Sequence, residues 1–85
     1  MTTHTLKTEP EYFQSVLDGT KTAEVRLNDR DYQVGDVLVL REMTPVADLY
    51  TGRECQRIIT HILTDPDERW LRRGIVVLSL QKVAY

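Results

Sequence analysis

The sequence contains a single cysteine and no long hydrophobic run. Cys55 has no second thiol with which to form an intramolecular disulfide, and no Cys and His residues share the spacing of metal ligands. The longest apolar runs, Val37–Leu40 and Ile75–Leu78, are far shorter than the ~20 residues of a membrane-spanning helix. The first residues, Met1–His4, show neither the basic nor the apolar region of a secretion signal. We therefore expect a cytoplasmic protein that uses no cofactor, no metal and no membrane.

Positive charge is also scarce. Lys and Arg number 11 against 13 Asp and Glu, which gives a net charge of −2 at pH 7. Nonspecific binding to duplex DNA relies on many cationic contacts to phosphates, so the composition argues against that function. The charge is uneven, because residues 1–50 carry five bases and nine acids, whereas residues 51–85 carry six bases and four acids. Eight of the 11 bases are arginines, which favour planar contacts with phosphates, so a local basic patch is compatible with the acidic total.

The length and composition fit one small globular unit. The chain has 85 residues, of which 41% are hydrophobic, enough for one compact core. It shows no internal repeat, no low-complexity tract and no linker. We therefore predict a single domain over residues 1–85.

The first regular element predicted is a short helix between Thr8 and Gly19. Thr8 and Glu11 have the spacing of a capping box, with Pro10 in the first turn. The apolar side chains recur at helical period: Tyr12, Phe13, Val16 and Leu17. Gly19 then supplies the left-handed residue at which helices commonly end. A helix of this length is not stable alone, so its apolar side must pack on the rest of the chain.

From residue 21 onward, the hydrophobic period changes to the two-residue period of strands. The alternation places Ala23 and Val25 on one side of a strand and the polar residues on the other: Thr22, Glu24 and Arg26. Further strands are predicted over His4–Leu6, Val37–Glu42, Arg53–Leu63 and Ile75–Val83. The third of these is expected to supply core residues: Ile58, Ile59, Ile62 and Leu63. One helical turn is predicted over Glu68–Arg73.

This order of elements restricts the fold class. A single helix excludes an all-parallel α/β sheet, because each parallel connection needs its own crossover. Several consecutive strands in so short a chain are typical of a small barrel, which leaves no exposed edges. We therefore predict an α+β fold, a small mixed or antiparallel β-barrel with one N-terminal helix covering one end.

The densest polar cluster of the sequence lies just after the predicted helix. Thr22, Glu24 and Arg26 share one face of a strand, and Lys21 directly precedes them. An acid between two bases is suited to binding a polar ligand, with the carboxylate holding the cations in place. The alternative is a solvated strand face with a ladder of charges, which contributes only a few tenths of a kcal/mol.

The spacing of this cluster resembles a known family. Gly19-x-Lys21-x-x-Glu24-x-Arg26 reproduces the G-x-K-x-x-E-x-R signature of ASCH domains, small β-barrels of the PUA-like superfamily. Other segments resemble a short bacterial and phage ASCH-like family of unassigned function: His4–Phe13, Asn28–Arg30, Val34–Asp36, Leu40–Glu42, Tyr50–Arg53 and Gly74–Leu80. The resemblance covers nearly the whole chain. It implies a barrel with the helix across one opening and a polar cleft between the helix and the barrel.

The resemblance also implies a partner, RNA or a nucleoside or nucleotide, bound in that cleft. The implied ligand-binding residues are Lys21, Glu24 and Arg26, with Lys7, Asn28 and Arg30 at the margin. Lys21 and Arg26 suit a phosphate or a base carbonyl, and Glu24 suits an exocyclic amine. Because proteins often recognise RNA through splayed bases in pockets, a net acidic protein is compatible with this function.

An enzymatic function is the first alternative. Some compact ASCH proteins resemble amidohydrolases of N4-acetylcytidine that use a Lys and a Thr on this strand and an acid further along. Lys21 matches that Lys, but Glu24 stands at the position of the Thr, and Thr22 lies one strand step away. The candidates for the further acid lie together: Asp65, Asp67 and Glu68. Because no base is identified beside a Thr nucleophile, we do not expect an enzyme; were it one, Lys21, Thr22 and Glu24 would be its residues.

A protein-interaction module is the second alternative, with exposed apolar residues in the 43–50 loop: Met43, Val46, Leu49 and Tyr50.

The role of Trp70 has two interpretations. This side chain either stacks on a base while Arg72 and Arg73 contact phosphates, or it plugs the end of the barrel.

Overall fold

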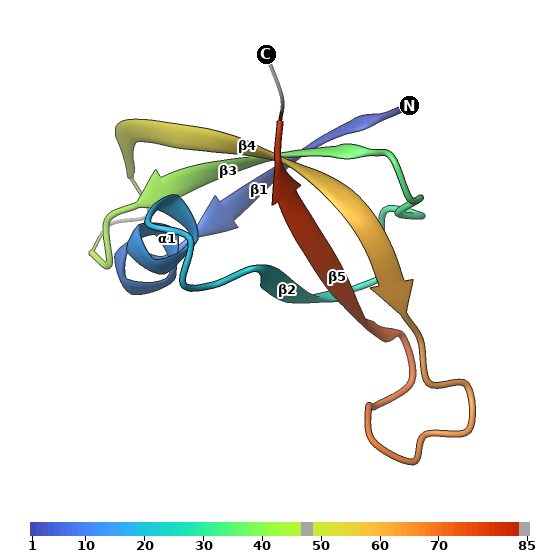
Figure 1. The fold of residues 1–85 in the computed structure, drawn as a ribbon. Helices are drawn as coiled ribbons and strands as arrows, with labels where there is room; N and C mark the ends of the chain where they lie inside the picture. Colours follow the sequence, from blue (N-terminus) through green and yellow to red (C-terminus); the bar gives the residue numbers. More distant parts are fainter. Residues whose placement is uncertain (47–48, 84–85) are drawn as a thin grey trace.

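The computed structural model describes residues 1–46 and 49–83, which form one helix and five strands (Figure 1). The elements are β1 (Thr3–Thr8), α1 (Pro10–Leu17), β2 (Ala23–Leu27), β3 (Val37–Met43), β4 (Tyr50–Leu63) and β5 (Ile75–Lys82). The predicted order of one early helix among strands is confirmed. None of the helices in these described ranges is long and apolar enough to cross a membrane.

The five strands form one mixed sheet in the order β1-β3-β4-β5-β2. β1 runs parallel to β3, and the other neighbours are antiparallel. The sheet curls into a half-barrel, and α1 lies at one end of it, beside the ends of β1 and β3 (Figure 1). The fold is therefore α+β, as predicted. The expected barrel without exposed edges differs, because β1 and β2 do not pair and remain the edges of the curled sheet.

Two arginines bridge these edges. Arg26 on β2 donates from Nη2 to the carbonyl of Lys7 at 3.0 Å, and Arg30 donates from Nη1 to the carbonyl of Thr5 at 2.9 Å. Both carbonyls belong to β1, so side chains satisfy backbone acceptors on the edge that β3 does not pair. Occupied carbonyls make an edge strand less available for pairing with another chain.

The concave side of the sheet holds the hydrophobic core. Its buried residues come from every strand except β2: Leu6, Leu38, Leu40, Ile59, Val76, Leu78 and Leu80, with Phe13 and Val16 from α1 and Tyr32 from a loop. Three residues predicted to pack in the core differ. Tyr12 and Leu17 on α1 are 49% and 39% exposed. Leu63 is half-exposed because a register shift between Ile59 and His61 interrupts the alternation of β4.

The predicted capping box is wrong. Thr8 is the last residue of β1 and pairs with Glu42 of β3, so its backbone belongs to the sheet. Glu9 is the residue before the helix and makes no side-chain capping bond. The predicted end is confirmed, since Gly19 follows α1 with φ of +87°, a conformation that glycine adopts without strain.

The helical turn predicted over Glu68–Arg73 is also wrong. This segment forms turns and bends in the loop between β4 and β5, which projects away from the sheet (Figure 1). Asp65 Oδ2 organises the loop by accepting the backbone N–H groups of Trp70 and Leu71, which lowers the pKa of Asp65. Trp70 is 87% exposed. Trp70 therefore does not plug the end of the barrel, because its loop projects away from the hydrophobic core.

A buried polar pair joins β1 to the start of β3. His4 Nε2 lies 2.8 Å from Asp36 Oδ2, and the His4 ring meets Tyr32 edge-on. Asp36 also accepts the backbone N–H groups of Thr2 and Gln33, each at 3.0 Å. The bond from His4, helped by these N–H groups, lowers the pKa of Asp36 to about 2 against the opposing effect of burial.

Candidate functional site

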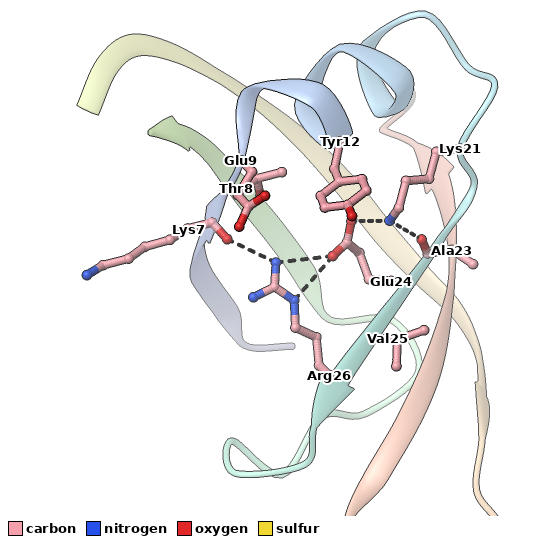
Figure 2. A pocket seen from close by; sticks show the side chains of 9 residues that line it. All are labelled: Lys7, Thr8, Glu9, Tyr12, Lys21, Ala23, Glu24, Val25 and Arg26. Carbon is pink, nitrogen blue, oxygen red and sulfur yellow. Dashed lines mark hydrogen bonds and ion pairs between the residues drawn. The ribbon is translucent and has the colours of Figure 1, made fainter. Parts of the chain in front are cut away.

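A cleft of about 440 Å³ opens where the end of β1, the start of α1 and strand β2 meet (Figure 2). Nine residues line it: Lys7, Thr8, Glu9, Tyr12, Lys21, Ala23, Glu24, Val25 and Arg26. Its volume lies within the range of small-molecule pockets.

Glu24 is the most buried charged group of this cleft. The residue is 4% exposed, whereas its neighbour Val25 is 62% exposed. The predicted alternation of β2 is therefore present, but Glu24 lies on the inward side and the apolar Val25 lies outside. Glu24 pairs in register with the fully buried Leu78 of β5. A carboxylate in such surroundings needs charged partners, because burying it alone is very unfavourable.

Lys21 and Arg26 are those partners, and they approach Glu24 from opposite sides (Figure 2). Lys21 Nζ lies 2.6 Å from Oε1 and also donates to the carbonyl of Ala23. Arg26 donates from Nε to Oε2 at 3.2 Å, and its Nη2 lies 3.1 Å from the same oxygen. Both cationic side chains are about one quarter exposed. The site therefore presents two partly accessible cations around a fixed carboxylate.

The turn after α1 fixes the position of Lys21. Its backbone N–H donates to the carbonyl of Ser15 at 2.9 Å. Thr20 donates twice to Asp18 Oδ1, from its hydroxyl at 2.7 Å and from its backbone at 3.0 Å, and both bonds lower the pKa of Asp18. Arg57 on β4 donates to the last-turn carbonyl of Val16 at 2.9 Å. These contacts anchor the end of the helix to the sheet and thereby hold Lys21 beside Glu24.

Comparison with known proteins adds a family to this geometry. The model of the family described as "Domain of unknown function (DUF3850)" matches residues 3–80. The chain belongs to the DUF3850 family.

A relative of this DUF3850 chain is the "Uncharacterized 12.9 kDa protein in GpA 3′ region" of Escherichia phage P2. The two are 43% identical over 74 residues, which cover 87% of this chain and 64% of the phage protein. The chain thus spans just under two thirds of that relative.

The residues predicted for the site divide into two groups in this DUF3850 chain. Lys7, Lys21, Glu24 and Arg26 line the one cleft. Asn28 and Arg30 are not among its lining residues. Asn28 Oδ1 accepts the N–H of Tyr32 at 3.2 Å, and Arg30 binds β1, so both hold the loop after β2.

Of the residues proposed for catalysis, Lys21 and Glu24 lie together in the cleft, whereas the others are not among its lining residues. Thr22 is exposed and lines a neighbouring hollow together with Lys21. The three candidate acids all lie in the β4–β5 loop, outside the cleft lining, and Asp65 is committed to backbone N–H groups there. In the same loop, Glu68 lies 3.5 Å from Arg73. The loop also carries the predicted stacking and phosphate residues, Trp70, Arg72 and Arg73, away from the cleft lining.

The apolar loop proposed for protein binding is exposed in part. Val46, Leu49 and Tyr50 are exposed, and Met43 is partly buried. The Arg41 guanidinium lies over the Tyr50 ring, 3.7 Å from its centroid. Residues 47 and 48 of this loop lie outside the described residues.

Five of the nine lining residues were missed by the sequence reasoning, and three of them carry polar side chains: Thr8, Glu9 and Tyr12. Thr8 is 4% exposed, and its hydroxyl finds no hydrogen-bond partner within the described residues. Glu9 and Tyr12 come from the first turn of α1, and Tyr12 is 49% exposed. The pattern assigned Tyr12 to the core and Thr8 to a cap. A better signal was the position of both residues close to the junction of β1 and α1, shortly before the polar cluster.

Proposed function

We propose that this protein binds RNA, or a nucleotide-sized part of it, in the cleft between α1 and β2. The observation that carries this proposal is the buried Glu24 carboxylate held between Lys21 and Arg26 on the wall of an open cleft. Charge-assisted hydrogen bonds from such groups are about twice as strong as neutral ones.

The chemistry of the site suits a nucleotide in three respects. The cations contact a phosphate or a base carbonyl, and the carboxylate accepts from an amine or ring N–H. The half-exposed Tyr12 ring at the cleft offers a face on which a base stacks. The proposal needs no broad basic surface, which agrees with the net charge of −2.

The proposal extends to the wider relationship of the family. The curled mixed sheet, the helix at its end and the G-x-K-x-x-E-x-R residues around one cleft support placing this DUF3850 chain among the ASCH domains of the PUA-like superfamily.

An NMR titration of the isotopically labelled protein tests the function. The ligands are short single-stranded RNA, cytidine and N4-acetylcytidine, with acetate measured in the same samples. We expect shift changes concentrated at residues 21–26, and weaker binding by Lys21→Met than by Lys82→Met, a matched change of an exposed lysine on β5.

Each outcome decides between the candidates. Shift changes at the cleft without acetate support the binding function. Release of acetate from N4-acetylcytidine would assign an amidohydrolase instead. The absence of any response would contradict both and leave a protein-binding function as the better hypothesis.

A further inference from the structure

We infer that the cleft selects guanine among the nucleobases, an inference that rests on the proposed function. It comes from the order of hydrogen-bonding groups around Glu24. Lys21 lies against Oε1 and Arg26 lies against Oε2, on opposite sides of the carboxylate (Figure 2). Across the site the groups therefore run donor, acceptor, acceptor, donor.

The two carboxylate oxygens retain the capacity to bind a ligand. A carboxylate has about four lone-pair sites. Lys21 Nζ donates one hydrogen bond to Oε1, and Arg26 Nε donates one to Oε2. Arg26 Nη2 lies 3.1 Å from Oε2 but donates its hydrogen bond to the Lys7 carbonyl. By this count one lone pair on each oxygen remains for two adjacent donors. Lys21 Nζ has three hydrogens, of which Glu24 and Ala23 take two.

Guanine matches this arrangement better than the other bases. Its Watson–Crick edge presents the O6 acceptor followed by two adjacent donors, N1–H and N2–H. The O6 acceptor meets Lys21 Nζ, the N1–H donor meets Glu24 Oε1, and the N2–H donor meets Glu24 Oε2. Adenine and cytosine offer an amino donor next to a ring nitrogen acceptor, and uracil offers one N–H between two carbonyls. Each of these places an acceptor against a carboxylate oxygen, which is a repulsive contact and a source of selectivity.

The surroundings of the carboxylate make the selection effective. Glu24 is 4% exposed and fixed by two cations, so its oxygens do not turn to suit another base. Little conformational entropy is then lost when the ligand binds. Tyr12 at the cleft supplies a stacking surface, and the volume of about 440 Å³ is that of a small-molecule site.

Calorimetric titration of the intact protein with GMP, IMP, AMP, CMP and UMP tests the inference. IMP keeps O6 and N1–H but lacks the N2 amine, so it removes one of the two donors alone. We expect GMP to bind tightest, with the other four weaker by about 5- to 150-fold, the range typical of a bidentate base contact. Single-stranded U-rich oligonucleotides with and without one central G then distinguish RNA from a free nucleotide as the source of the guanine.

Two variants complete the test. Glu24→Gln replaces one acceptor by a donor and is expected to abolish the preference for GMP over AMP. Because Glu24 is buried, Lys21→Met provides a second measurement at a more exposed residue, and Lys82→Met is the control. Equal affinity for all five nucleotides, lost in Lys21→Met, would retain the proposed function and overturn guanine selection. A preference for another base, or equal binding of GMP and IMP, would also overturn it, and the absence of nucleotide binding would overturn both proposals.

Discussion

Acid is expected to weaken the fold through Asp36. The pKa of this buried carboxyl is lowered from 3.8 to about 2, first by the bond from His4. Since one pKa unit corresponds to about 1.4 kcal/mol, the ionised Asp36 contributes on the order of 2 kcal/mol to the free energy of unfolding. The folded state binds the proton less readily than the unfolded state. The contribution is therefore present above pH 3.8 and is lost as the pH falls from 3.8 to about 2.

Urea denaturation of the wild-type protein and Asp36→Asn, followed by circular dichroism, isolates this contribution. Fluorescence is a poor probe here, because the single Trp70 is already 87% exposed in the folded state. We expect the stability difference between the two proteins to shrink by about 2 kcal/mol from near pH 6 to near pH 2. The exposed Asp29 provides the matched control, and Asp29→Asn should show no such change. A difference that is independent of pH would refute the reasoning.

Three further changes test other parts of the structure. Thr8→Val removes a buried hydroxyl without a partner in the described residues, and it should raise the free energy of unfolding by about 1 kcal/mol; a loss of stability in urea denaturation would show that the hydroxyl is satisfied. Arg30→Met removes the bond to the Thr5 carbonyl and should lower stability by about 1 kcal/mol and speed amide exchange in β1; unchanged exchange would contradict the bridging role. Trp70→Ala should change stability by less than about 0.5 kcal/mol in thermal unfolding, because the side chain is exposed; a large loss would place it in a packed environment.

Local patterns predicted the elements well. The helical period of residues 12–17 and the two-residue period of later segments correspond to α1 and four of the strands. Gly19 marked the end of α1 because a left-handed residue is a local requirement. Thr8 was wrongly predicted as a helix cap because its actual role depends on a contact that is not local. Its pairing with Glu42 joins residues distant in sequence, and no local signal reveals such a partner.

The candidate site could be predicted only in part. Alternation showed that Glu24 and Arg26 share a face, but not that Glu24 is buried, because that depends on how the sheet curls. Arg30 looked like a margin residue, yet the curl brings β1 within reach of its guanidinium. The exposure of Trp70 was equally invisible, since it follows from the projection of the β4–β5 loop.

The position of Arg26 links two properties of the molecule. One guanidinium both contacts Glu24 in the cleft and donates to the Lys7 carbonyl on the edge of β1. A ligand group that accepts from Nη2 competes with that carbonyl for the same hydrogens. Ligand binding in the cleft and the contact between β2 and β1 therefore depend on the same Arg26 guanidinium. Deuterium uptake along β1, including residues before the two that line the cleft, Lys7 and Thr8, then becomes a measure of whether the cleft is filled.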